Sequence, residues 1–133
     1  MDPKTVKKDR KYTKEHEWAK LEQGELQVGI TAFAVDQLGD VTLVSLDVAL
    51  GDAVKAGDAF GTIESVKTLS DLFAPVSGSI VAINSNLENK PELVNEDCYG
   101  TGWMIKIKCY DDTQSEGLLS DDEYSTFVSG LDH

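Results

Sequence analysis

The feature of this sequence that most constrains its fold is the dense, even spacing of its turn signals. Two Gly-Asp pairs, Gly51-Asp52 and Gly57-Asp58, stand six residues apart, and Gln23-Gly24 is a typical hairpin turn. Between these turns lie short segments that are rich in β-branched residues. This pattern indicates short antiparallel strands in a sandwich or barrel. The 133-residue length predicts one domain of this kind.

We therefore expect a mainly β fold with short helices at its periphery. The expected strands lie within 15–30 (a hairpin) and at 41–46, 60–65, 69–73, 79–83 and 103–108. In the last of these, Trp103, Ile105 and Ile107 alternate with Met104, Lys106 and Lys108, which is typical of a half-buried strand. We expect residues 84–96 to be irregular.

Two helices are expected at the periphery. The first runs from Thr31, a suitable N-cap residue, to Gly39. The second spans 115–127, close to the C-terminus. The expected inner face of the second helix is formed by Leu118, Leu119, Tyr124 and Phe127.

The charge of the chain excludes several classes of partner. Twenty-four acidic and 12 basic residues give a formal net charge of −12, which repels nucleic acid and anionic membranes. No apolar run approaches the roughly 18 residues of a membrane helix, and the N-terminus lacks the apolar region of a signal peptide. We expect a monomer that stays where it is made, in the cytoplasm of a bacterium. If the source is eukaryotic, we expect the mitochondrial matrix instead.

The sequence does not look like that of a catalyst. It contains no nucleophile elbow, P-loop or metal-ligand spacing. The two histidines, His16 and His133, lie near opposite ends of the chain. Cys98 and Cys109 form no C-x-x-C pair, and the acidic neighbours of Cys98 would raise its pKa. We expect both cysteines to be structural thiols.

Lys67 is the residue with the clearest chemical potential. It lies at the centre of the expected hairpin formed by 60–65 and 69–73. At such a tip the side-chain amine of Lys67 is exposed and is held by a rigid backbone. Such a position suits a group that one enzyme modifies and several active sites then use. An ordinary solubilising lysine in a turn fits the same position. The nearby carboxylates, Glu64 and Asp71, show no pairing for acid–base chemistry.

The motifs around Lys67 resemble those of lipoyl and biotinyl carrier domains. Biotin carriers of this kind place the lysine between two methionines, whereas Val66 and Thr68 flank Lys67, so biotin is disfavoured. The rest of the chain, from about 12 to 127, is similar to the glycine cleavage system H protein family. The motifs that carry this similarity lie, in the family's order, at 12–18, 28–31, 38–40, 51–58, 63–67, 74–78, 91–97 and 102–108.

This resemblance implies a fold and a function. The fold is the lipoyl-domain-like barrel-sandwich hybrid of two antiparallel sheets with short peripheral helices. The cofactor is (R)-lipoate, attached covalently to Lys67. The function is that of a non-catalytic shuttle, which carries an aminomethyl group from the pyridoxal-phosphate-dependent glycine decarboxylase (P protein) to the tetrahydrofolate-dependent aminomethyltransferase (T protein). Dihydrolipoyl dehydrogenase (L protein) then reoxidises the carrier.

The resemblance also implies roles for four further residues. Glu64 and Gly78 occupy positions that the lipoylating enzyme reads, although Gly78 is also explained by a turn that needs a positive φ. Glu17 and Asp71 match acidic positions near the cleft in which the loaded arm docks. The alternative is that both residues are solvated surface carboxylates without a role in docking.

Some features of the chain stay open at this point. We expect residues 1–10 to be an N-terminal extension and 11–133 to be a single carrier domain with a C-terminal helix. Cys98 departs from the family, which often has proline at this position. The sequence also fits an H-like relay protein that donates lipoyl groups to other enzymes, or a structural β domain that carries no prosthetic group.

Overall fold

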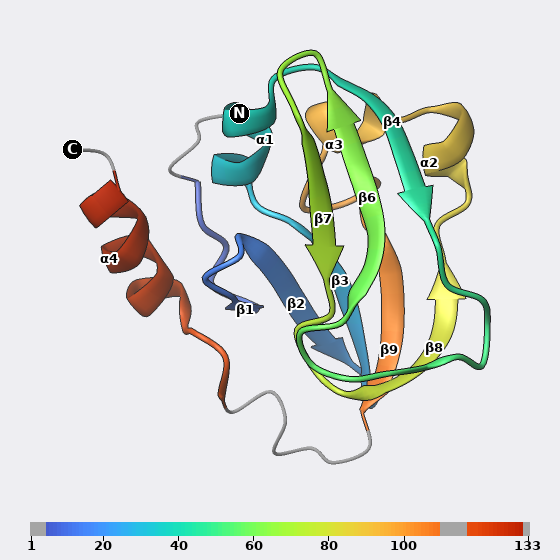
Figure 1. Ribbon diagram of the computed structural model, residues 1–133. Helices are drawn as coiled ribbons and strands as arrows, with labels where there is room; N and C mark the ends of the chain where they lie inside the picture. The colour runs from blue at the N-terminus through green and yellow to red at the C-terminus, as the bar shows by residue number, and fades with distance from the viewer. Residues whose placement is uncertain (1–4, 110–116, 132–133) are drawn as a thin grey trace.

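The computed structural model describes residues 5–109 and 117–131 and shows two antiparallel sheets packed face to face (Figure 1). Within these residues, six strands form the larger sheet in the order β1-β2-β3-β9-β8-β5, and three form the smaller in the order β4-β6-β7. The strands are β1 (Lys11–Tyr12), β2 (Glu17–Glu22), β3 (Glu25–Ile30), β4 (Val41–Leu46), β5 (Ala53–Val54), β6 (Ala59–Ser65), β7 (Leu69–Phe73), β8 (Gly78–Ile83) and β9 (Ile105–Cys109). The helices are α1 (Ala32–Leu38), α2 (Asn86–Asn89), α3 (Leu93–Glu96) and α4 (Asp121–Leu131). The predicted mainly β fold with two antiparallel sheets is confirmed.

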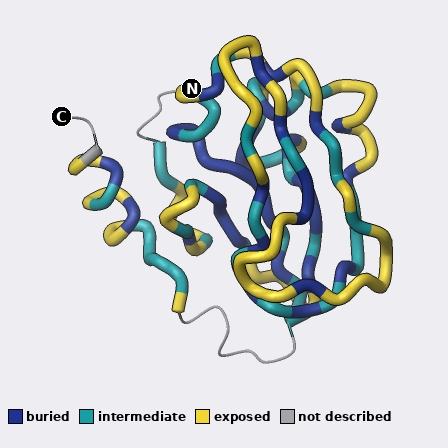
Figure 2. Tube along the Cα trace, in the orientation of Figure 1, coloured by how far each residue is buried: buried dark blue, intermediate teal, exposed yellow. Residues whose placement is uncertain are grey.

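The main core fills the space between the two sheets. Alternate side chains of the strands point inward, and the buried residues appear as dark blue stretches along the strands in Figure 2. The buried side chains of the facing sheets include Leu26, Val28, Ile80, Ile105 and Ile107 on the larger sheet and Phe60, Ile63 and Leu72 on the smaller. Burial of each large side chain contributes about 2 kcal/mol, so these rows fix the register of every strand.

The turns at the two Gly-Asp pairs are built alike, as their spacing predicts. Gly51 and Gly57 have φ values of 90° and 92°, which only glycine adopts readily. The carboxylates of Asp52 and Asp58 each accept a hydrogen bond from the backbone N–H three residues earlier, at 2.8 and 2.9 Å. The predicted Gln23-Gly24 hairpin turn is also present, with positive φ at both residues.

A second, aromatic core lies where the N-terminal segment, the larger sheet and α4 meet. The rings of Tyr12 and Tyr124 stack at 4.7 Å, and Trp18 donates its indole N–H to the carbonyl of Cys98 at 2.9 Å. The Arg10 guanidinium covers the Trp18 ring at 4.6 Å and donates to the carbonyl of Tyr99. Residues 5–10 therefore contact the domain, and the boundary at residue 10 stays a prediction.

Three local predictions were wrong. Residues 84–96 are not irregular but contain α2 and α3, each anchored by one buried apolar side chain, Leu87 and Val94 respectively. Before the last strand Met104 is fully buried and Trp103 is only partly buried, because both residues precede β9, which begins at Ile105, and the strand alternation does not extend to them.

The third error concerns the C-terminal helix, which begins at Asp121. Residues 115–116 lie outside the described residues, and Leu118 precedes the helix. Leu119 pairs with Tyr12 in an isolated β-bridge. A capping box sets the start of α4, because Glu123 N donates to Ser120 Oγ at 3.1 Å and Ser120 N donates to Glu123 Oε1 at 2.9 Å.

Candidate functional site

Lys67 lies at the tip of the β6–β7 hairpin, at the upper end of the molecule in Figure 1. Its side chain is exposed, as is most of this tip in Figure 2. The turn is closed by a hydrogen bond from Ser65 N to the carbonyl of Thr68 at 2.8 Å. The buried Ser65 hydroxyl accepts hydrogen bonds from Lys67 N at 3.1 Å and Thr68 N at 3.2 Å. One serine side chain therefore satisfies the backbone N–H groups of Lys67 and Thr68 and orders this part of the turn.

A cavity of about 450 Å³ opens beside this hairpin, between β7, α1 and the start of β2. Its wall combines apolar side chains with polar ones. Among the lining residues are Glu17, Phe33, Leu38, Thr68 and Asp71. Because Thr68 directly follows Lys67, a flexible group attached to the lysine has this cavity within reach.

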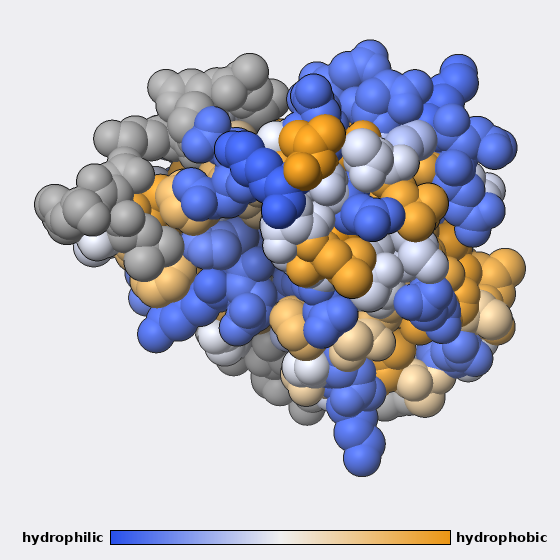
Figure 3. Space-filling model, turned by 45° about the horizontal axis from the view of Figure 1, so that its top comes forward, coloured by the Kyte–Doolittle hydropathy of each residue, from blue (hydrophilic) through white to orange (hydrophobic). Residues whose placement is uncertain are grey.

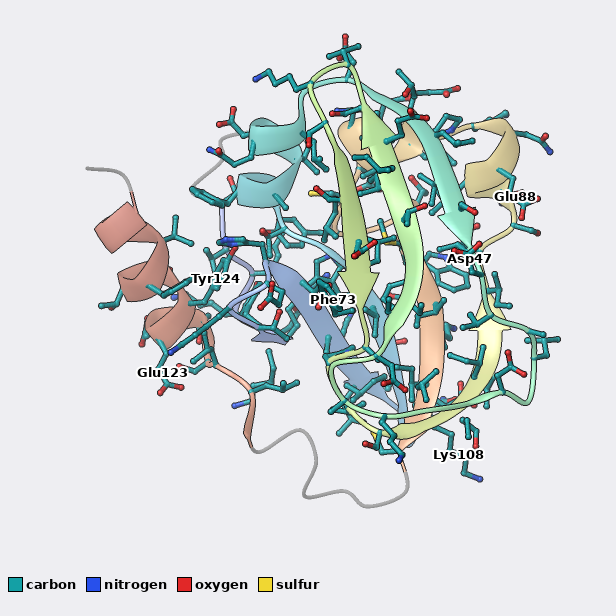
Figure 4. All side chains as sticks on the ribbon, in the orientation of Figure 1. Asp47, Phe73, Glu88, Lys108, Glu123 and Tyr124 are labelled. Carbon is teal, nitrogen blue, oxygen red and sulfur yellow. The ribbon has the colours of Figure 1, made fainter. Side chains whose placement is uncertain are left out.

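Glu17 is buried in the wall of the cavity, with only 2% of its surface exposed. Its Oε2 accepts a hydrogen bond from Phe73 N at 2.7 Å, and the Thr13 hydroxyl donates to Oε1 at 3.4 Å. Figure 4 labels Phe73 at the end of β7. Burial raises the pKa of Glu17 to about 8, because the charged form has lost its water. The alternative of a solvated surface carboxylate is therefore wrong for Glu17.

Asp71 lines the same cavity from β7. Its side chain is exposed, and it lies opposite Thr62 of β6 in the sheet. The structure thus brings two sequence-distant carboxylates, Glu17 and Asp71, to one cavity in different states of hydration. Their role in docking the loaded arm stays a prediction.

Glu64 and Gly78 do not lie together. Glu64 is exposed on β6 next to the lysine turn, whereas Gly78 begins β8 at the opposite end of the sandwich (Figure 1). The explanation of Gly78 by a positive φ is wrong, because Gly78 is not among the positive-φ glycines. A methyl group at Gly78 would collide with the carbonyl oxygen of Lys108, whose side chain is labelled at the lower end of Figure 4. Close approach of β9 therefore explains this glycine, and recognition by an enzyme stays a prediction.

The surface around the lysine turn is mixed in character. Val66 and Leu69 flank the turn with 66% and 64% of their surface exposed, next to the carboxylate of Glu64. Figure 3 brings this end of the molecule toward the viewer and shows apolar patches set between polar ones. A surface of this kind suits a protein partner that approaches the lysine.

Two residues of this site were not predicted from the sequence. Ser65 was missed, although a serine two residues before a turn lysine is a recognisable turn-capping signal. His16 also lines the cavity, and it has a positive φ of 68°. Its Nδ1 lies 2.8 Å from the hydroxyl of Tyr124, and burial lowers the pKa of His16. These contacts depend on α4, so no local sequence pattern announces them.

Other kinds of site find no support in the described part of the chain. No group of three or more histidine, cysteine or acidic residues there is arranged to hold a metal ion. None of the described helices has the length and apolarity to cross a membrane. Burial and the Asp97 carboxylate raise the pKa of Cys98 to about 11, in the direction predicted for a structural thiol.

Comparison with known proteins gives consistent matches along the chain. The model of a family described as "Glycine cleavage H-protein" matches residues 10–130. The glycine cleavage system H protein of Listeria innocua is 49% identical over 128 residues, which cover 96% of this chain and 99% of that protein. The corresponding protein of Staphylococcus epidermidis is 50% identical over 123 residues, or 92% of this chain and 97% of that one. The crystal structure of a glycine cleavage system H protein from Mycobacterium marinum matches with a TM-score of 0.85 at 37% identity, and the match covers 93% of this chain and 99% of that one.

Proposed function

The chain belongs to the glycine cleavage H-protein family, and on that premise we propose that Lys67 is the residue that carries its lipoyl group. Proteins of this family are lipoyl carriers, and this chain has the role of a shuttle in the glycine cleavage system. The observation that carries the proposal is the exposed amine of Lys67 at a turn ordered by Ser65. An amide bond to lipoate needs such an accessible primary amine.

The attached lipoate would supply a disulfide that accepts the aminomethyl group from the P protein. The T protein then takes the one-carbon unit, and the L protein restores the disulfide. The chain's own part is to present the arm to each partner and to release each partner again, so we propose that it is a non-catalytic component. Its net charge of −12 favours rapid encounter with basic clefts and keeps copies of the chain apart, which supports a monomer.

We propose that the cavity beside the hairpin shelters the loaded arm. The aminomethyl cargo carries an amine that is protonated near neutral pH, so a carboxylate is its natural partner. Glu17 and Asp71 line the cavity, and its apolar lining residues would shield a labile cargo from water. A cation beside Glu17 would also favour the charged form of this buried carboxyl group, whose pKa is raised in the absence of the cation.

The lipoylating enzyme is a further partner in this proposal, and Glu64 and Gly78 are the residues proposed for its recognition. Glu64 has the stronger case because it is exposed beside the lysine turn. The matched relatives named above are bacterial proteins, which supports a location in the bacterial cytoplasm.

Glycine-dependent exchange of CO2, catalysed by a cognate P protein, tests this function. The lipoylated wild-type protein should support exchange, and Lys67→Arg, which keeps the charge but has no lipoate, should not. If the lipoylated wild type supports no exchange, the shuttle role is overturned in favour of a lipoyl relay.

A further inference from the structure

The lysine turn rests on a short segment that follows α1. We call this segment, residues 39–41, the shelf. Gly39 ends α1 with φ 76° and ψ −149°, a conformation that is essentially restricted to glycine. The Gly39 N–H donates to the carbonyl of Val35 at 3.0 Å. The chain therefore leaves the helix sharply and passes next to the tip of the β6–β7 hairpin.

Two contacts join the turn to the shelf. Val66 N donates a hydrogen bond to the carbonyl of Asp40 at 3.1 Å. The stem of Lys67 passes over Gly39 so closely that a methyl group there would lie 3.4 Å from Lys67 Cε and 3.7 Å from Cδ. The turn is thus held by its own Ser65 side chain and by its contacts with the shelf.

A single side chain holds the shelf from the other side. Asn95, on α3, donates from Nδ2 to the carbonyl of Gly39 at 2.9 Å. Its Oδ1 accepts a hydrogen bond from Val41 N at 2.8 Å. The amide therefore bridges both ends of the shelf, and the intervening carbonyl of Asp40 is left to face the lysine turn.

We propose that Asn95 is a positioning residue for Lys67, acting through the shelf. The inference rests on the proposed function, in which Lys67 is the lipoylated residue. A lysine that must enter the active site of another enzyme reacts only from suitable conformers, so the apparent KM rises as the fraction of these conformers falls. Removal of the Asn95 amide releases both ends of the shelf and lowers that fraction.

The test measures lipoylation of the full-length apo protein by a lipoylating enzyme with its activated lipoyl donor, over a range of carrier concentrations. Asn95→Ala loses two hydrogen bonds, so we expect KM for the carrier to rise by at least about fivefold, the effect of the net contribution of one of them, with kcat little changed. Hydrogen exchange at the Val66 amide should be faster, because its acceptor on the shelf has become mobile.

Asn84→Ala is the matched control. Asn84 is a second asparagine whose side chain makes two hydrogen bonds to the backbone, because its Nδ2 donates to the carbonyls of Thr101 and Trp103 at 3.0 and 2.7 Å. Asn84 is buried, whereas Asn95 is half-buried. Its partners lie between α3 and β9 rather than on the shelf. This variant should lose similar or greater stability but keep the wild-type KM and the wild-type exchange rate at Val66.

The outcomes separate the two proposals. If the wild type is not lipoylated at Lys67, the proposed function is wrong. If the wild type is lipoylated and Asn95→Ala keeps its KM, or if Asn84→Ala raises KM equally, the positioning role is wrong. Should Asn95→Ala fail to fold, Asn95→Asp replaces it, because its carboxylate keeps the acceptor for Val41 N but has no donor for the carbonyl of Gly39. A wild-type KM for that variant also overturns the inference.

Discussion

Replacing Glu17 by glutamine should change how the stability of this protein depends on pH. Glu17 is buried in the cavity wall, and burial raises its pKa to about 8, against an ordinary value of 4.5. Glutamine has nearly the same shape, can accept the hydrogen bond from Phe73 N and carries no charge at any pH. The variant therefore isolates the free energy of ionising this one group.

The sign follows from proton linkage. Because the pKa is raised in the folded state, the folded protein binds this proton more tightly than the unfolded chain does. The stabilisation is complete below about pH 4.5 and is lost as the pH rises through 8. Each pH unit in this window costs about 1.4 kcal/mol, so the whole difference is on the order of 5 kcal/mol.

Urea denaturation of both proteins at several pH values between 5 and 9 measures this effect. The free energy of unfolding of Glu17→Gln should rise relative to that of the wild type as the pH increases, and the difference should level off above pH 8. A difference that stays constant from pH 5 to pH 9 would refute the reasoning, since Glu17 would then ionise equally well in the folded and unfolded states.

Three further variants test the other residues of the site. Gly78→Ala should lower the free energy of unfolding by about 2 kcal/mol, because the added methyl collides with the carbonyl of Lys108; wild-type stability in urea would contradict the assigned contact. Glu64→Ala should change stability by less than about 0.5 kcal/mol but slow lipoylation, and lipoylation at the wild-type rate would remove its recognition role. Asp71→Asn should leave folding and lipoylation intact but shorten the lifetime of the aminomethyl-loaded form, followed as ammonia release without T protein. Release at the wild-type rate would return Asp71 to ordinary surface charge.

The strands could be predicted because their signals are local. Alternating apolar residues and turn residues specify each segment without reference to the rest of the chain, as at the turns of Gly51 and Gly57. Helices α2 and α3 were missed for the same reason. Each has only one turn and one buried anchor, Leu87 or Val94, which is too little to form a helical period.

The site was predicted less completely, because its properties arise between distant segments. Lys67 at the hairpin tip was predicted from the sequence. The buried carboxyl group of Glu17 accepts its short hydrogen bond from Phe73, which lies on a strand of the other sheet. The reason for glycine at position 78 lies on the paired strand β9, and the support of the lysine turn comes from Asn95. No pattern within one segment contains such information.

Peptide mapping of protein purified from its native host tests the central claim, that this chain carries lipoate on Lys67, most directly. After digestion, mass spectrometry should find one lipoyl group, on the peptide that contains Lys67, and fragmentation should place it on that lysine. An unmodified Lys67, or a lipoyl group on any other lysine, would contradict the claim.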